Sequence, residues 1–233
     1  MKKIKLATLG MCLALVLSCS TNTGNGALIG TGGGAVLGAI IGNIAGNTAV
    51  GAAVGAAVGA GAGALIGKHM DNVKAKAAAQ LENAKVEEVV DANGLKAVKV
   101  TFDAGILFAS GKSDLSDRSR SDLQSFAKLL KDDGLCSVDI QGYTDNQGWR
   151  NSSADESRQK NINLSLQRAQ AVKNYLSSLG VSSAQFKNVI GCGEQNPVAS
   201  NDTEAGRQQN RRVEVYLYAS EKMIEKANNG ELK

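Results

Sequence analysis

The sequence predicts an α+β domain, a two-layer sandwich of β-α-β-α-β-β order in which helices cover one face of a mixed sheet. Three observations favour this class. Short runs of alternating apolar residues recur through the second half of the chain, segments with helical spacing of apolar residues separate them, and turn-forming residues stand at their junctions. Ahead of the domain, glycine recurs at every fourth position between residues 26 and 67, which predicts an all-α helical hairpin.

Five segments follow from these patterns. In chain order they are a signal peptide (1–18), a glycine-rich segment (19–67), a helical stalk or linker (68–85), the folded domain (86–220) and a C-terminal tail (221–233). The chain's 233 residues suffice for one ordinary domain with such extensions.

The folded domain opens with a predicted β-hairpin. Runs at 86–90 and 95–102 flank Asp91-Ala92-Asn93-Gly94, and an Asn-Gly pair is a strong signal for a hairpin turn. The remaining elements follow in the order that the predicted class requires. They are a helix capped by Ser116 or Asp117 and ended by Asp132-Asp133-Gly134, a strand at 137–141, a helix from about Leu164 to Leu179, a strand at 186–191 and a final strand at 210–218.

The stretch from Gly142 to Ala169 carries the candidate binding site. Asp145 follows the strand at 137–141, and Arg168 falls in the second turn of the helix predicted to begin at Leu164. Ligands of open α/β sheets bind at the carboxyl ends of strands. A carboxylate and a guanidinium that face one ligand suit a zwitterion, because the acid binds an ammonium and the arginine fork binds a carboxylate.

Four motifs in and around this stretch resemble one family. They are Gly142-Tyr143-Thr144-Asp145; Asn161, Leu164, Ser165, Arg168 and Ala169; Gly191, Gly193, Glu194 and Pro197; and Gly206, Arg207, Asn210, Arg211, Arg212, Val213 and Glu214. In this order, over about residues 95–218, they resemble the OmpA-like peptidoglycan-binding domain. The resemblance implies non-covalent binding of the diaminopimelate in the stem peptide of the cell wall.

The resemblance also assigns roles to single residues. Asp145 would take the ammonium and Arg168 the carboxylate of diaminopimelate. We expect Asn161 to shape or cap the turn that enters the helix, while Arg211 and Arg212 stand in a strand and are interpreted as structural. The expected peptidoglycan-binding residues are Asp145, Arg168, Thr144, Asn161 and Leu164.

Three departures from the family pattern concern this site. The polar segment Trp149–Lys160 is several residues longer than in many family members; we interpret it as a solvated surface loop, with stacking of Trp149 over the ligand as the alternative. Lys160 stands where an aromatic residue is frequent. Ala109 follows Phe108, where an aspartate is usual, so one contact to the peptide is expected to be absent.

The N-terminus has the pattern of a secretory signal. A basic start is followed by an apolar run, Leu6–Leu17, that is too short to span a bilayer. Val16-Leu17-Ser18-Cys19 resembles a bacterial lipobox, in which the cysteine is acylated and becomes the first residue of the mature chain; a plain signal peptide is the alternative. No aspartate follows Cys19, which favours a protein anchored by lipid in the outer membrane, with its domain facing the periplasm.

Glycines form a ladder between the signal and the domain. They recur from Gly26 to Gly46 and, after a break, from Gly51 to Gly67, with no charged residue among them. The spacing keeps them on one helical stripe, so we interpret the segment as a membrane-inserted or membrane-apposed hairpin that also suits a homo-oligomer. It resembles the glycine-zipper segments of several bacterial envelope lipoproteins. A flexible Gly/Ala linker is the alternative.

Composition excludes several classes of function. Removing residues 1–18 takes three lysines away and leaves 23 basic against 22 acidic residues, so charge gives no indication of nucleic-acid binding. His69 is the single histidine, and it stands outside the predicted folded domain without a cysteine or histidine nearby. We therefore expect no metal site, no cofactor and no enzymatic activity.

Two cysteines remain in the folded domain, because Cys12 lies in the signal and Cys19 is the expected lipidation site. Cys136 enters one predicted strand and Cys192 leaves another. If those strands are parallel, the thiols lie at opposite ends of the sheet, ~20 Å apart, beyond the ~7 Å between Cα atoms that a disulfide spans. We therefore expect both thiols to be free.

These patterns favour a non-enzymatic anchor that tethers the outer membrane to the cell wall. Two alternatives stay open at this point. The glycine ladder also suits a membrane assembly or channel-like factor that a wall-binding domain positions. Ala109 and the long segment before Asn161 would fit a domain that has lost its ligand and serves as a protein-interaction module.

Overall fold

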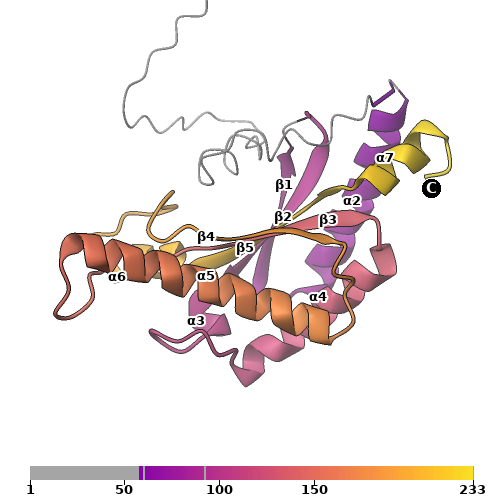
Figure 1. Cartoon of the computed structure of the whole chain (residues 1–233). Helices are drawn as coiled ribbons and strands as arrows, with labels where there is room; N and C mark the ends of the chain where they lie inside the picture. Colours follow the sequence, from indigo (N-terminus) through magenta and orange to yellow (C-terminus); the bar gives the residue numbers. More distant parts are fainter. Residues whose placement is uncertain (1–57, 60, 92, 233) are drawn as a thin grey trace, which may run out of the picture. The chain divides into compact units, whose positions relative to one another are not determined.

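The computed structural model describes residues 58–59, 61–91 and 93–232. The predictions for the signal peptide, Cys19 and the glycines from Gly26 to Gly55 lie outside these residues. The described elements follow one another along the chain as labelled in Figure 1. They are α2 (Ala62–Gln80), β1 (Ala84–Val90), β2 (Lys96–Asp103), α3 (Ala104–Leu107), α4 (Asp117–Asp133), β3 (Cys136–Gly142), α5 (Ala154–Ser178), β4 (Phe186–Gly191), α6 (Glu204–Asn210), β5 (Arg212–Ala219) and α7 (Glu221–Asn228).

Within the described part of the chain, the strands form one mixed sheet in the order β1-β2-β5-β3-β4. β3 and β4 are parallel, and the other neighbours are antiparallel. β1 and β2 form the predicted hairpin, in which Asp91 Oδ1 accepts hydrogen bonds from the backbone N–H groups of Asn93 and Leu95. Gly94 follows with a φ of 77°, in the left-handed region that favours glycine.

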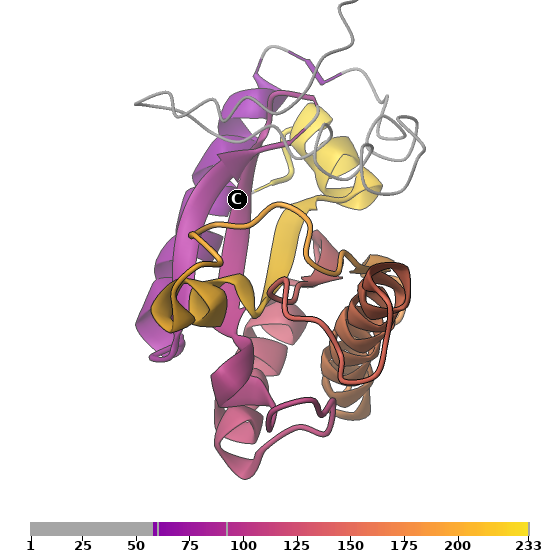
Figure 2. The ribbon, with the colours of Figure 1, turned by 90° about the vertical axis from the view of Figure 1, so that its left-hand side faces the viewer.

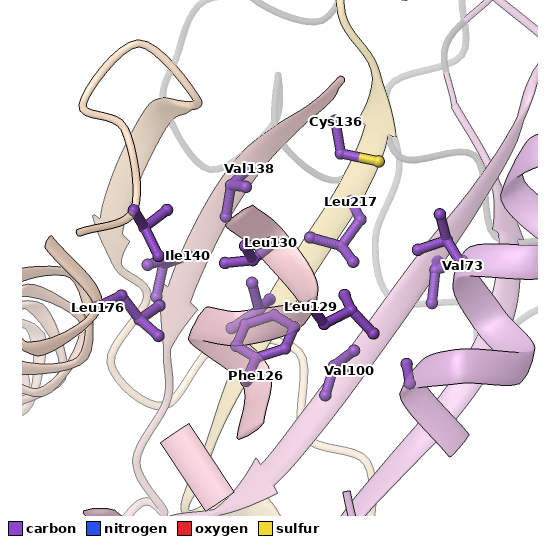
Figure 3. Packing of buried hydrophobic residues seen from close by; sticks show 14 of the residues in the cluster. Val73, Val100, Phe126, Leu129, Leu130, Cys136, Val138, Ile140, Leu176 and Leu217 are labelled. Atoms are coloured by element: carbon purple, nitrogen blue, oxygen red, sulfur yellow. The ribbon is translucent and has the colours of Figure 1, made fainter. Parts of the chain in front are cut away.

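The helices α2, α4, α5 and α7 share one hydrophobic core with the sheet. Figure 3 shows Phe126 and Leu130 of α4 among Val138 of β3, Leu217 of β5 and Leu176 of α5, and all five side chains are fully buried. Burying a side chain of this size contributes about 1.5–3 kcal/mol. The predicted α+β class is confirmed: the order β2-α4-β3-α5-β4-β5 is the expected one, with the short helices α3 and α6 added.

The helix α4 begins and ends at the predicted caps. Ser116 Oγ accepts a hydrogen bond from the backbone N–H of Ser119, and Gly134 closes the helix with a φ of 62°. A left-handed residue after the last turn is a common helix terminator, and glycine adopts it without steric cost.

The helix α2 corrects the expectation of a stalk. Its residues Ile66, Met70 and Val73 are buried, and it packs against β1, β2, α4 and α7, so it belongs to the folded body. A stalk was expected because residues 68–85 are rich in alanine, lysine and glutamate, and helix propensity alone does not tell a buried helix from an exposed one. Gly63 and Gly67, the end of the glycine ladder, lie in α2; among described residues, a Cβ at either would meet nothing closer than 3.7 Å.

The last helix, α7, falls in the segment that was expected to be a tail. Ser220 Oγ caps it by accepting from the backbone N–H of Met223, and both Met223 and Ile224 are buried. Figure 2 shows α7 beside α2, against which it packs. The two helices close the same end of the core.

The helix α5 begins ten residues before the predicted start, so the interpretation of Trp149–Lys160 as a loop is wrong for its larger part. Ala154 is the first helical residue, and a capping box precedes it. Ser153 Oγ accepts from the backbone N–H of Glu156, while the Glu156 carboxylate accepts from the backbone N–H of Ser153. This reciprocal pair satisfies two donors that a helix start leaves open.

The side chains of the sheet that point away from the core form a polar network. Arg212 Nε donates to Glu214 Oε1 over 2.7 Å, and its guanidinium carbon lies 3.8 Å from the ring centroid of Tyr143. Burial raises the pKa of Tyr143, and it raises the pKa of Cys192 to about 11. The structural role expected of Arg212 agrees with these contacts.

Both cysteines of the described chain are free and buried, as expected. Cys136 is the first residue of β3, whereas Cys192 follows the last residue of β4. Since β3 and β4 are parallel, the two lie toward opposite ends of the sheet. Among the described helices, none combines the length and the apolar character that a bilayer span requires.

Candidate ligand-binding site

The candidate site is built where α5 crosses the carboxyl ends of β3 and β4. Gly142 and Gly191 are the last residues of these strands. A Cβ on Gly142 would lie 2.1 Å from the carbonyl oxygen of Ser165, and one on Gly191 would lie 2.5 Å from that of Ile162. Only glycine permits this approach, which brings the segment after β3 close to the middle of α5.

Asp145 is a buried acid with both oxygens engaged; it is 6% exposed. Oδ1 accepts from the backbone N–H of Gln147 over 3.1 Å, and Oδ2 accepts from Arg211 Nη1 over 2.6 Å. A carboxylate offers about four lone-pair positions. Two of them are therefore open to a further donor.

Arg168 is a buried base that is only partly engaged; it is 3% exposed. Its Nε donates to the carbonyl oxygen of Lys112 over 3.0 Å, and its guanidinium carbon lies 5.2 Å from the ring centroid of Phe108. Within the described chain, neither terminal nitrogen has a hydrogen-bond partner. These two nitrogens form the face that binds a carboxylate with two parallel hydrogen bonds.

Asp145 and Arg168 share one electrostatic environment without pairing. Burial lowers the pKa of Arg168, the nearby charge of Arg211 lowers it further, and the charge of Asp145 opposes both. In the described part of the chain, Asp145 is paired with Arg211 instead. The structure thus buries an acid and an arginine near each other without an ion pair between them.

Arg211 was expected to be structural, yet its guanidinium reaches the candidate site. Nη1 binds Asp145 and Nη2 binds Glu204 Oε1, each over 2.6 Å. Although burial acts to lower it, the pKa of Arg211 is raised, because the hydrogen bonds to both acids favour the charged form. The charges of Asp145, Glu204, Arg168 and Arg211 balance, which suits a ligand without net charge.

Thr144 and Leu164 border the same place. The backbone N–H of Thr144 donates to the carbonyl oxygen of Gly193 over 2.8 Å, but its buried Oγ1 has no hydrogen-bond partner among the described residues. Buried hydroxyls in folded proteins nearly always have a partner. This hydroxyl is therefore an exception, next to Asp145 in the chain. Leu164, on α5, is 9% exposed and adds apolar surface.

Asn161 shapes the loop ahead of α5, as expected, but does not cap the helix. It lies inside α5, where its Nδ2 donates to the carbonyl oxygen of Gln147 over 3.1 Å and its Oδ1 accepts from Trp149 Nε1 over 2.8 Å. Ser153 provides the cap. Asn161 therefore ties the segment 145–149 to the helix that carries Arg168.

The remaining departures from the family pattern are exposed. Ala109 is an exposed residue after Phe108, whose ring packs against Arg168. Lys160 Nζ donates to Ser152 Oγ over 2.8 Å and so braces the start of α5.

The fold is an α+β sandwich in which Asp145 and Arg168 lie near the carboxyl ends of the two parallel strands. Residues 107–211 match the OmpA family, so the predicted resemblance is confirmed. Residues 1–71 match the YMGG-like Gly-zipper, which confirms the resemblance of the glycine ladder.

Individual relatives fit this assignment. The probable lipoprotein YiaD of Escherichia coli (strain K12) is 32% identical over 152 residues, which cover 65% of this chain and 64% of the relative. The peptidoglycan-binding protein ArfA of Mycobacterium tuberculosis (strain ATCC 25618 / H37Rv) is 32% identical over 165 residues, which cover 64% of this chain and 48% of the relative. The chain thus spans between 48% and 64% of the length of these two proteins.

A solved structure agrees with the fold. The cell wall anchor of the T6SS from Pseudomonas aeruginosa is 26% identical, with a TM-score of 0.51. The similarity covers 65% of this chain and 97% of that chain.

Proposed function

We propose that this chain binds peptidoglycan non-covalently, through the diaminopimelate of the stem peptide, and tethers the outer membrane to the cell wall. The observation that carries the proposal is the arrangement of Arg168 and Asp145. The terminal nitrogens of Arg168 have no partner in the described chain, and Asp145 lies close enough to shift the pKa of Arg168. Two buried opposite charges that do not pair suit one zwitterion.

Each polar group of the site has a role toward such a ligand. The side chain of diaminopimelate ends in an amine and a carboxylate on one carbon. Arg168 binds the carboxylate with its two terminal nitrogens, and Asp145 accepts from the ammonium with its open lone pairs. Thr144 Oγ1 donates to the same carboxylate, while Leu164 and Asn161 border the chain of the ligand.

The anchoring half of the proposal rests on the N-terminus. Acylation of Cys19 would hold the protein in the outer membrane, with the OmpA-family domain in the periplasm. The lipobox supports this, as does the relative named as a probable lipoprotein. With a lipid at one end and peptidoglycan at the other, the protein acts as a mechanical link and not as an enzyme.

Co-sedimentation of the full chain with purified peptidoglycan tests the wall-binding half. Asp145→Asn and Arg168→Gln should each leave most of the protein in the supernatant. Arg207→Gln is the matched control, because Arg207 binds Glu204 but not Asp145. Free meso-diaminopimelate should release the wild type from the pellet. If both site variants sediment like the control, the site assignment is wrong.

Membrane fractionation tests the anchor. Cys19→Ser should move the protein from the membrane fraction to the soluble periplasmic fraction, without changing its sedimentation with peptidoglycan. A variant that stays in the outer membrane would show that something other than an acylated Cys19 holds it there.

A further inference from the structure

Trp149 is an exposed aromatic residue next to the candidate site. It is the chain's single tryptophan. Among the described residues, Trp149 and Val198 are the large hydrophobic side chains that remain exposed, and Trp149 is 37% exposed. A single exposed hydrophobic residue is common on protein surfaces. Trp149 differs from such a residue because hydrogen bonds hold it in place.

Hydrogen bonds fix the position of Trp149 both directly and through Asn161. Its Nε1 donates to Asn161 Oδ1 over 2.8 Å, and its backbone N–H donates to Ser157 Oγ over 3.0 Å. Asn161 Nδ2 in turn holds the carbonyl oxygen of Gln147, two residues earlier. Because the indole N–H is used inward, the part of the side chain left for an outside partner is the apolar ring.

The same contacts join Trp149 to Asp145. The backbone N–H of Gln147 donates to Asp145 Oδ1 over 3.1 Å, so Asp145, Gln147, Asn161 and Trp149 form one connected group. The ring is thereby held at a set position on the segment that follows the acid. A ligand bound at Asp145 and extending past this segment would meet the ring.

The first turns of α5 support this arrangement. The capping box of Ser153 and Glu156 starts the helix, and Lys160 Nζ donates to Ser152 Oγ. Ser157, on the first turns, holds the backbone of Trp149. The segment that was read from the sequence as a loop is thus an ordered base for one aromatic ring, with polar groups around it.

We propose that the exposed face of Trp149 is a second subsite, which binds an amino-sugar ring of the glycan strand adjoining the stem peptide. This inference rests on the proposed function. A pyranose ring has an apolar face of C–H groups and a polar rim, which matches a flat ring among hydroxyl, amide and ammonium groups. The other parts of a stem peptide are small or charged, so the sugar offers the larger apolar area.

Two probes separate the subsites. One is the tripeptide L-alanyl-γ-D-glutamyl-meso-diaminopimelate, and the other is the same tripeptide on its GlcNAc–MurNAc disaccharide. With the full chain in calorimetric titrations, Trp149→Ala should weaken binding of the disaccharide peptide about tenfold, the factor that 1.4 kcal/mol represents. Binding of the bare tripeptide should change less than twofold. Trp149→Phe keeps a ring without the indole N–H and should retain most of the preference for the disaccharide.

Intrinsic fluorescence gives an independent readout, because Trp149 is the one tryptophan. The disaccharide peptide should shift its emission, while the tripeptide should leave it nearly unchanged. Equal losses on both probes in Trp149→Ala, or no loss on either, overturn the sugar subsite. Asp145→Asn should abolish binding of both probes. If both probes bind Asp145→Asn as they bind the wild type, the proposed function fails. The difference between the losses of affinity for the two probes in Trp149→Ala would still decide whether the sugar subsite exists. If the wild type binds neither probe, both ideas fall.

Discussion

Arg211 is the residue through which the electrostatics of the site can be tested most directly. Its guanidinium is held between two acids, Asp145 and Glu204, so each terminal nitrogen already donates to a carboxylate. In this arrangement Arg211 acts as the internal counterion of Asp145. An ammonium that binds Asp145 must approach this cation. Arg211→Gln should therefore tighten binding of a stem peptide.

The size of the effect follows from Coulomb's law. Two like charges ~5 Å apart repel by ~0.8 kcal/mol in water and ~3.3 kcal/mol at an effective dielectric constant of 20. The side chain of Arg211 is 26% exposed, which places the value between these limits after discounting for solvent. Relief of about 1–2 kcal/mol corresponds to roughly five- to thirty-fold tighter binding. The unliganded variant should lose about 2 kcal/mol of stability, because Asp145 keeps a buried charge without its partner.

Calorimetric titration of the tripeptide and urea unfolding measure these two quantities. Arg207→Gln is the control: Arg207 shares Glu204 with Arg211 but does not bind Asp145, so its affinity should stay within about twofold of the wild type. Saturating tripeptide should restore part of the stability lost in Arg211→Gln, because the ammonium takes the place of the missing cation. Weaker tripeptide binding by Arg211→Gln, with Arg207→Gln unchanged, would refute the reasoning and place Arg211 on the ligand.

Three further predictions concern the scaffold. Gly142→Ala should cost about 3 kcal/mol of stability in urea unfolding, because the new methyl would overlap the carbonyl of Ser165; a variant of wild-type stability would contradict the packing. Burial raises the pKa of Asp139, so its contribution to stability should be full below the unfolded pKa of about 4 and be lost as the pH rises through the folded pKa; relative to wild type, Asp139→Asn should gain stability as the pH rises above about 4, and a pH-independent difference would count against this. Thiol titration without reductant at pH 8 should find two more reactive thiols in urea than in the native protein, from Cys136 and Cys192; no increase would indicate a disulfide.

Elements with local signals could be predicted from the sequence. The hairpin of β1 and β2 depends on the turn that contains Asn93 and Gly94, and α4 depends on Ser116 and Gly134, which fix backbone geometry within a few residues. Apolar spacing then assigned β3 and β4. In these cases the sequence and the structure agree because the interactions that decide them are close in the chain.

The start of α5 could not be found from apolar spacing, because residues 154–160 are almost all polar. Its signal was the capping box, Ser153 and Glu156, which was present in the sequence but had no apolar stripe beside it. The burial of α2 and α7 depends on contacts between residues far apart in the chain. The spacing of Met223, Ile224 and Ala227 favours a helix with one buried face, but it does not identify what covers that face.

Some residues of the candidate site could be predicted from the sequence, and others could not. Asp145 and Arg168 could be proposed from the strand end and the helix that carry them. Arg211 could not, because its role depends on how far β5 and α6 bring it toward Asp145. The unpaired Thr144 Oγ1 is likewise a property of packing, which no sequence pattern reports.

The pair Arg211 and Arg212 explains why the segment after β3 is ordered before any ligand arrives. The guanidinium of Arg212 lies 3.8 Å from the ring centroid of Tyr143, and its carbonyl oxygen accepts from the backbone N–H of Tyr143 over 2.9 Å. The adjacent Arg211 holds the carboxylate of Asp145, two residues further on. Two neighbouring residues at the start of β5 thus hold the segment at two points, one through a ring and one through an acid. Because the contacts of Arg212 with Tyr143 remain in Arg211→Gln, the segment should keep most of its order there, and the entropic cost of binding should change little while the repulsion at Asp145 is removed.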